Sequence, residues 1–174
     1  ACVVSALRSD ESLSERASIM LADWSLEESE LAGLSPMDAG RVLAGRIRDL
    51  CGPKPVRAIV GFSMYVWNRP VMEEGARALR SLIPGVALFA GGPEATASPG
   101  RIEPFDCLVR GEGEGASREI VRLFLDGTPF PPALRDGVRN QPEPCSSLPS
   151  PWLDGNLDGC RSVRECGGAL WELS

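Results

Sequence analysis

Three loops that carry glycine and glutamate are the part of this sequence best suited to chemistry. They are Ser63-Met64-Tyr65, Gly91-Gly92-Pro93-Glu94 and Gly111-Glu112-Gly113-Glu114. Glycine lets the backbone approach a ligand closely, and an ionised carboxylate can only accept hydrogen bonds. The loops therefore favour a ligand rich in amide or hydroxyl donors over one rich in phosphate. Tight turns of a doubly wound fold also need glycine, which is the alternative explanation for any one loop taken singly.

The composition excludes several common kinds of active site. The chain has no histidine, which removes Ser-His-Asp and Cys-His nucleophiles and every histidine metal site. Lys54 is the only lysine, against 17 arginines, so neither a phosphate-binding lysine loop nor a Schiff base is expected. Neither GxGxxG nor GxxxxGK[ST] occurs, so the sequence does not support a dinucleotide or nucleoside triphosphate site.

The net charge and the cysteines indicate which binding partners and which cellular compartment to expect for this protein. The net charge of −6 does not attract nucleic acid or an anionic membrane, and no apolar run reaches the roughly 18–20 residues that span a bilayer. The six cysteines include no CxxC pair and no zinc-like double pair. Cys2 and Cys107 lie in apolar runs and are predicted to be buried in strands. We therefore expect reduced thiols, no metal site, no nucleic-acid or membrane partner, and a cytoplasmic location.

The elements that must position the three loops alternate between strands and helices. Strands are predicted over 2–7, 17–23, 56–63, 86–90 and 106–110, and helices over 36–50, 70–82 and 115–126. The segment 14–28 also fits a helix, although we favour the strand. Apolar strands separated by helices predict a Rossmann-like (flavodoxin-like) α/β fold, a doubly wound parallel sheet covered on both faces. Ligands of such sheets bind beyond the carboxyl ends of the strands, where the three loops would meet.

The sequence changes in character after Gly127. Seven of the 15 prolines lie between residues 129 and 151, which predicts an extended C-terminal tail. We therefore divide the chain into a domain over 1–128 and a proline-rich linker over 129–174. The linker is expected to be poorly anchored, with Trp152 and Trp171 exposed.

Two shorter features have competing explanations. Asp10-Glu11 resembles the acidic pair of a phosphoryl receiver domain, but Ser63 and Arg110 stand where such a domain needs aspartate and lysine. The receiver function is therefore excluded. In Trp67-Asn68, either Trp67 is partly buried and Asn68 caps the following helix, or the pair faces a ligand.

Three segments together resemble a known family. Val60 to Asn68, Ala90 to Glu94 and Asp106 to Glu114 (DCLVRGEGE) are similar to the N-terminal cobalamin-binding domain of cobalamin-dependent radical S-adenosylmethionine enzymes. Residues 148–153 and 170–174 resemble the linker that leads into the radical barrel of that family. The resemblance covers residues 56–174 well and residues 1–50 loosely.

The resemblance implies that this chain binds cobalamin. The implied contacts come from the three loops and from one residue of the first predicted loop: Ser12, Ser63, Met64, Tyr65, Gly91, Gly92, Glu94, Gly111, Glu112, Gly113 and Glu114. Many cobalamin domains carry DxHxxG, whose histidine ligates cobalt, and here Ser12 stands in the place of that histidine. The implied cofactor is therefore base-off, with no axial ligand from the protein.

The resemblance also implies a partner, the radical barrel of the same parent chain. In the family, a CxxxCxxC motif holds the iron–sulfur cluster that acts on S-adenosylmethionine, and this chain has no such motif. Catalysis, such as methyl transfer, would belong to the missing barrel, and we assign no catalytic residue here. The segment 10–34 has room for one element, whereas the family fits a helix and a strand there. Two alternatives stay open: a vestigial docking domain that binds no cofactor, and a flavodoxin-like module for another small ligand.

Overall fold

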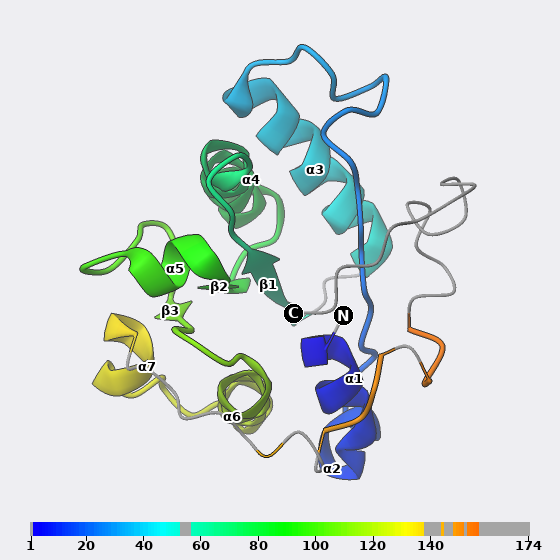
Figure 1. Ribbon diagram of the computed structural model, residues 1–174, viewed down its shortest axis with the longest axis vertical. Coiled ribbons are helices and arrows are strands. Elements are labelled where there is room, and N and C mark those ends of the chain that lie inside the picture. Colours follow the sequence, from blue (N-terminus) through cyan, green and yellow to red (C-terminus); the bar gives the residue numbers. More distant parts are fainter. Residues whose placement is uncertain (1, 53–56, 138–143, 145–147, 152, 157–174) are drawn as a thin grey trace.

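A parallel sheet lies between two layers of helices (Figure 1). The computed structural model describes residues 2–52, 57–137, 144, 148–151 and 153–156. Its strands are β1 (Ile59–Ser63), β2 (Ala87–Gly91) and β3 (Cys107–Leu108), in the order β1-β2-β3. Ser63 pairs with Gly91 in register, so the carboxyl ends of β1 and β2 finish level with each other.

Helices α3 (Pro36–Cys51) and α4 (Arg69–Leu82) cover one face of the sheet (Figure 1). The hydroxyl of Ser35 caps α3 by accepting a bond from the Asp38 amide at 3.2 Å. The two helices cross closely at Gly40 and Gly75, because a Cβ on Gly40 would lie 2.6 Å from the Gly75 nitrogen.

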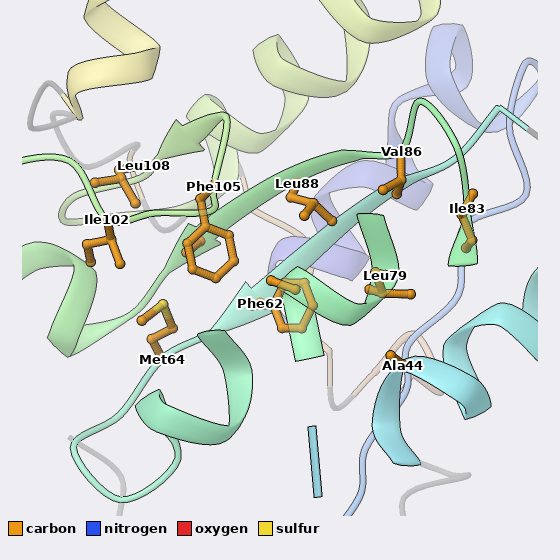
Figure 2. Close-up of a cluster of buried hydrophobic side chains, with 12 residues drawn as sticks. Ala44, Phe62, Met64, Leu79, Ile83, Val86, Leu88, Ile102, Phe105 and Leu108 are labelled. Carbon is orange, nitrogen blue, oxygen red and sulfur yellow. The ribbon is translucent and has the colours of Figure 1, made fainter. Parts of the chain in front are cut away.

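The main core fills the space between α4 and this face of the sheet (Figure 2). Leu79 of α4 and Leu88 of β2 are almost fully buried there. The rings of Phe62 and Phe105 meet edge to face, with centroids 5.6 Å apart. This core holds β1 and β2 in place and thereby positions the loops that follow them.

Helix α6 (Glu114–Asp126) covers the opposite face, with α1 (Cys2–Ser9) and α2 (Glu11–Ser14) beside it (Figure 1). Ile120 of α6 packs with Phe89 and Cys107 of the sheet. Val121 packs with Leu7 and Leu13 from the two N-terminal helices. The sheet is thus covered on both faces, and the predicted α/β class with a parallel sheet is confirmed.

The N-terminal predictions are wrong. Residues 2–7 belong to helix α1 and not to a strand, because Val3, Ala6 and Leu7 also have helical spacing and pack on α6. Cys2 is consequently exposed on a helix and not buried in a strand. The segment 17–23 forms neither helix nor strand, and the Ile19 carbonyl accepts bonds from the Arg8 side chain.

The structure also contains two short helices that the sequence analysis did not predict. Helix α5 (Pro93–Ala97) begins directly after β2, and α7 (Pro132–Asp136) lies within the segment predicted to be extended. The extended prediction is therefore wrong for α7, whose Leu134 is buried against the α6 face of the sheet. Proline is tolerated at the first position of a helix, which is how both helices begin. Trp152 and Trp171 lie outside the described residues.

In the described part of the chain, every helix is too short or too polar to cross a bilayer.

Candidate functional site

The loops after the three strands meet at one edge of the sheet. The Met64 amide donates to the Gly91 carbonyl at 2.8 Å, and the Glu94 amide donates to the Met64 carbonyl at 3.2 Å. The Gly111 amide donates to the Thr96 hydroxyl at 3.0 Å, which joins the third loop to α5. The structure therefore brings together the three loops as predicted.

Gly92 holds the first two loops against each other. Its φ is +98°, a conformation that residues with a side chain rarely adopt. A Cβ at this position would lie 2.7 Å from the Met64 carbonyl oxygen. The Met64 side chain itself is fully buried in the main core (Figure 2). Met64 and Gly92 thus fix the positions of the first two loops at this edge of the sheet.

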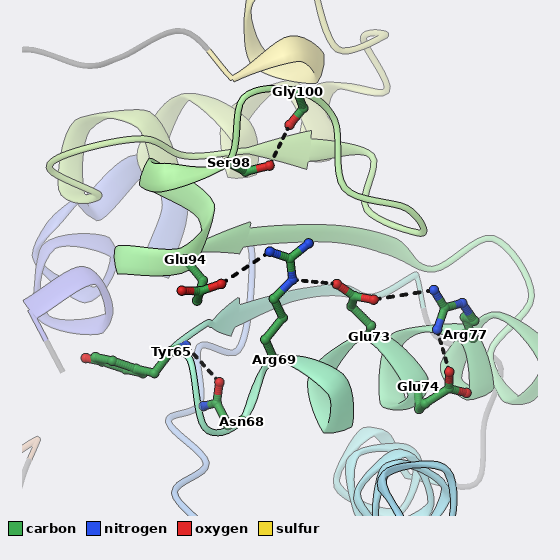
Figure 3. A network of polar contacts seen from close by, with 9 residues as sticks. All are labelled: Tyr65, Asn68, Arg69, Glu73, Glu74, Arg77, Glu94, Ser98 and Gly100. Atoms are coloured by element: carbon green, nitrogen blue, oxygen red, sulfur yellow. Dashed lines mark hydrogen bonds and ion pairs between the residues drawn. The ribbon is translucent and has the colours of Figure 1, made fainter.

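The turn from Ser63 to Asn68 presents aromatic side chains to solvent. Asn68 Oδ1 accepts from the Tyr65 amide at 2.8 Å (Figure 3). Asn68 Nδ2 donates to the Ser63 carbonyl at 3.1 Å. The Asn68 side chain therefore stabilises the turn and does not cap α4. The rings of Tyr65 and Trp67 stack with centroids 4.8 Å apart and planes 13° apart. Trp67 is 69% exposed, so it is not the partly buried tryptophan that one interpretation expected.

An ion-pair network ties this turn to α5 (Figure 3). The Arg69 guanidinium contacts Glu94 at 3.2 Å and Glu73 at 2.8 Å. These bonds raise the pKa of Arg69, with the bond to Glu73 as the larger cause. Glu94, a predicted cofactor contact, is therefore held by the protein itself. Sequence analysis missed Arg69, although its spacing of four residues from Glu73 on one helix was an available indication.

The third loop carries one exposed and one buried carboxylate. Glu112 is exposed, whereas Glu114 is 8% exposed and its Oε2 has no hydrogen-bond partner. Gly113 packs against α1, since a Cβ there would lie 2.9 Å from Val3 Cγ2. The two glutamates of this loop thus differ sharply in environment, which the repeated Gly-Glu pattern does not reveal.

Comparison with known proteins finds a family model that matches this edge. Residues 55–121 match the profile of the family described as "B12 binding domain", and the match spans all three loops. This part of the chain is therefore similar to B12-binding domains.

Two curated relatives of this chain are methyltransferases. One is the 2-(S-pantetheinyl)-carbapenam-3-carboxylate methyltransferase of Streptantibioticus cattleyicolor, 36% identical over 136 residues, which cover 67% of this chain and 20% of that protein. The other is the cobalamin-dependent radical SAM methyltransferase TokK of Streptomyces tokunonensis, 33% identical with the same coverage. The chain therefore spans about a fifth of the length of these relatives. The resemblance to the cobalamin-binding domain of radical S-adenosylmethionine enzymes is confirmed.

One solved structure is also similar. It is the N-terminal domain of a hypothetical protein from Thermotoga maritima, with 22% sequence identity and a TM-score of 0.43. The alignment covers 79% of this chain and 88% of that one.

The structure places Ser12 away from the edge where the three loops meet. Ser12 lies in α2 and donates to Asp10 Oδ1 at 2.5 Å, while Asp10 pairs with Arg122 at 3.2 Å. The Ser12 bond is the main cause that lowers the pKa of Asp10. Arg122 is eight residues beyond Glu114, about 12 Å along the axis of α6. Ser12 was assigned to a loop after a first strand, and that strand is a helix here.

The edge where the three loops meet nevertheless has features that suit cobalamin. The Tyr65–Trp67 stack offers a flat apolar surface to solvent. A Cβ on Gly91 would have its nearest contact at 3.6 Å, so this position leaves room. The orphaned Glu114 Oε2 is an acceptor that needs a donor. Together these features fit a large ligand that has an apolar face and N–H groups at its rim.

Metal-binding and thiol chemistry have little support in the described part of the chain. No cluster of three or more Cys, Asp or Glu residues is arranged there to hold a metal ion. Burial raises the pKa of the Cys107 thiol to about 12, with a smaller contribution from Asp106. Cys107 is thus a core residue and not a reactive thiolate.

Two hollows in the described residues lie away from the three loops. One, of about 570 Å³, lies between α3 and α4 and is lined by Arg41, Arg77 and Leu82 among others. The other, of about 420 Å³, lies beside α1 and is lined by Arg8 and Asn156 among others. The predicted cofactor contacts therefore depend on the surface at the strand ends and on neither hollow.

Proposed function

We propose that this chain binds cobalamin at the carboxyl edge of its sheet and serves as the accessory domain of a radical S-adenosylmethionine enzyme. The observation that carries the proposal is the match of residues 55–121 to the B12-binding family, because that span includes all three loops. The relatives support methyl transfer as the reaction of the whole enzyme. Cobalamin supplies a cobalt-bound methyl group for such chemistry.

The residues of this chain would bind and orient the cofactor. The Tyr65–Trp67 stack would lie against an apolar face of the corrin, and Ser63 and Gly91 would approach its rim at the strand ends. Met64 and Gly92 would fix the position of both loops from below. The other side of the edge would be lined by Gly111, Glu112, Gly113 and Glu114. Glu94 would contribute by holding Arg69 in place through their ion pair.

We further propose that cobalamin is bound base-off, without an axial ligand from the protein. The chain has no histidine. Ser12 lies in α2 beside Asp10, which pairs with Arg122 of α6, away from the strand edge. Met64 is fully buried in the core, so its sulfur does not face a ligand.

The partner and the boundaries follow from the same proposal. Residues 1–128 would form the cofactor-binding domain, and residues 129–174 would lead to a radical barrel elsewhere in the parent protein. That barrel would hold the iron–sulfur cluster and S-adenosylmethionine. The cytoplasm is the compartment that we propose for the whole protein.

A vestigial docking domain that binds no cofactor is the second candidate. It is favoured by Glu94, which is already paired with Arg69, and by Gly113, whose open side is filled by Val3. Both contacts reduce the number of free groups at the edge.

Titration of the 174-residue chain with hydroxocobalamin separates the two candidates. We expect saturable binding of cobalamin at one site. Absorption spectroscopy measures this binding. The reduced Co(II) form should show no nitrogen superhyperfine splitting in its electron paramagnetic resonance spectrum. Splitting from an axial nitrogen would contradict the base-off proposal, and no binding at high micromolar cobalamin would support the vestigial domain.

A further inference from the structure

One buried acceptor at the strand edge lacks a donor. Glu114 is 8% exposed, and its Oε2 is enclosed with no hydrogen-bond partner. A buried acceptor of this kind costs free energy, so native structures nearly always satisfy it. The unpaired oxygen therefore indicates that a group from outside the described chain belongs beside it.

Glu114 is the first residue of α6 and directly follows the third loop. It shares one stripe with Ser117 and Val121, three and seven residues further along. Both of these residues are buried, and Val121 packs against α1 and α2, so Glu114 is on the side of α6 that faces α1. Because side chains of a helix tilt towards its N-terminus, the Glu114 side chain leans back towards the third loop.

The chemistry of a carboxylate limits the group that fits it. An ionised carboxylate only accepts hydrogen bonds, and it repels another carboxylate or a phosphate. A neutral N–H donor is the complement, and the corrin ring of cobalamin carries such donors as side-chain amides. The residues Gly111 and Glu112, in the loop directly before α6, are exposed to solvent.

Resting on the proposed function, we infer that Glu114 accepts a hydrogen bond from one side-chain amide of cobalamin and selects for an amide at that position. A corrin with a carboxylate there would place two negative charges together inside a poorly solvated site. Glu114 thus distinguishes the fully amidated cofactor from its acidic analogues. Glu119, which is exposed on the same helix, has no such role.

The test compares cobalamin with its three propionamide-derived monocarboxylates, in which one side-chain amide has been hydrolysed. Dissociation constants are measured by absorption titration for the wild-type chain, for Glu114→Gln, and for Glu119→Gln as the matched control, because Glu119 is exposed on the same helix. We expect the wild type to bind one monocarboxylate roughly tenfold more weakly than cobalamin. Glu114→Gln should bind that derivative nearly as well as cobalamin, because glutamine can donate to a carboxylate. Glu119→Gln should keep the wild-type ratio.

A second measurement distinguishes ligand selection from a structural role. Thermal unfolding of the ligand-free Glu114→Gln variant should occur at or above the wild-type temperature, since the buried Glu114 Oε2 has no hydrogen bond to lose. A lower temperature would indicate that Glu114 stabilises the fold, and it would overturn the inference. Equal affinity of the wild type for all three derivatives would also overturn it while leaving cobalamin binding intact. If the wild type fails to bind cobalamin itself, the proposed function fails and the inference fails with it.

Discussion

Asn156 donates a hydrogen bond of 2.8 Å from its side-chain amide to the hydroxyl of Ser5 in α1. Ser5 is 1% exposed and Asn156 is 8% exposed, so this contact is inside the protein. The Arg8 guanidinium also donates to the Asn156 side-chain oxygen. The proline-rich segment was expected to be poorly anchored, yet at Asn156 it is joined to the first helix.

Replacement of Asn156 should therefore destabilise the domain. In Asn156→Ala, the Ser5 hydroxyl loses a buried donor and Arg8 loses an acceptor, which should lower the free energy of unfolding by about 1–3 kcal/mol. Urea denaturation followed by circular dichroism measures the change. Leu153→Ala is the control, because Leu153 is 90% exposed and its truncation should change stability by less than about 0.5 kcal/mol. Equal stability of both variants would show that the Asn156 contact contributes nothing.

The two adjacent glycines after β2 should respond differently to alanine. Gly92→Ala combines a positive φ with a Cβ 2.7 Å from the Met64 carbonyl oxygen, so it should cost at least about 1–3 kcal/mol and displace the aromatic turn. Gly91→Ala meets only Val109 at 3.6 Å and should fold as the wild type does. If Gly91 approaches the corrin as proposed, Gly91→Ala should still weaken cobalamin binding. Thermal unfolding and cobalamin titration of both variants test this difference, and similar stabilities would contradict it.

The sequence predicted the central elements because strong, long patterns surround them. The helix expected over 36–50 is observed as Pro36–Cys51, and the strand expected over 86–90 is observed as Ala87–Gly91. The run over 2–7 is short and fits two periods equally well, so only its packing on α6 decides that it is a helix. The short helices α5 and α7 depend on local turns and tertiary contacts that no periodicity marks.

The candidate site was predicted as a set of loops but not as a set of contacts. Parallel strands place their carboxyl ends together, so the meeting of the three loops followed from the fold class alone. Whether a carboxylate is free depends on partners distant in sequence. Glu94 is bound by Arg69, 25 residues earlier, while Glu114 is buried without a partner. Ser12 was misplaced because its assignment depended on a strand that does not form.

The Cys107 thiol should make the stability of the protein fall at alkaline pH. Burial raises its pKa from 9.0 to about 12, so between these values the folded state keeps a proton that the unfolded state releases. The stabilisation is complete below pH 9 and is lost as the pH rises from 9 towards 12. Urea titrations of the wild type and of Cys107→Ala over this range measure it, and the variant should show the shallower decline. In the native protein at pH 8, iodoacetamide should label the exposed Cys2 and spare Cys107. Rapid labelling of Cys107 would contradict its burial.

Removal of the exposed indole of Trp67 should weaken cobalamin binding without disturbing the fold. Trp67 is 69% exposed and its main ring contact is the stack on Tyr65, so Trp67→Ala should change the free energy of unfolding by less than about 1 kcal/mol. If the stack lies against the corrin, the same variant loses a large apolar contact surface, and the dissociation constant should rise by about tenfold or more. Trp67→Phe should recover part of the affinity, because a smaller ring can still stack. Absorption titration with hydroxocobalamin gives the dissociation constants, and Leu153→Ala, another exposed apolar position, is the control. Unchanged affinity in Trp67→Ala would place the corrin away from this stack.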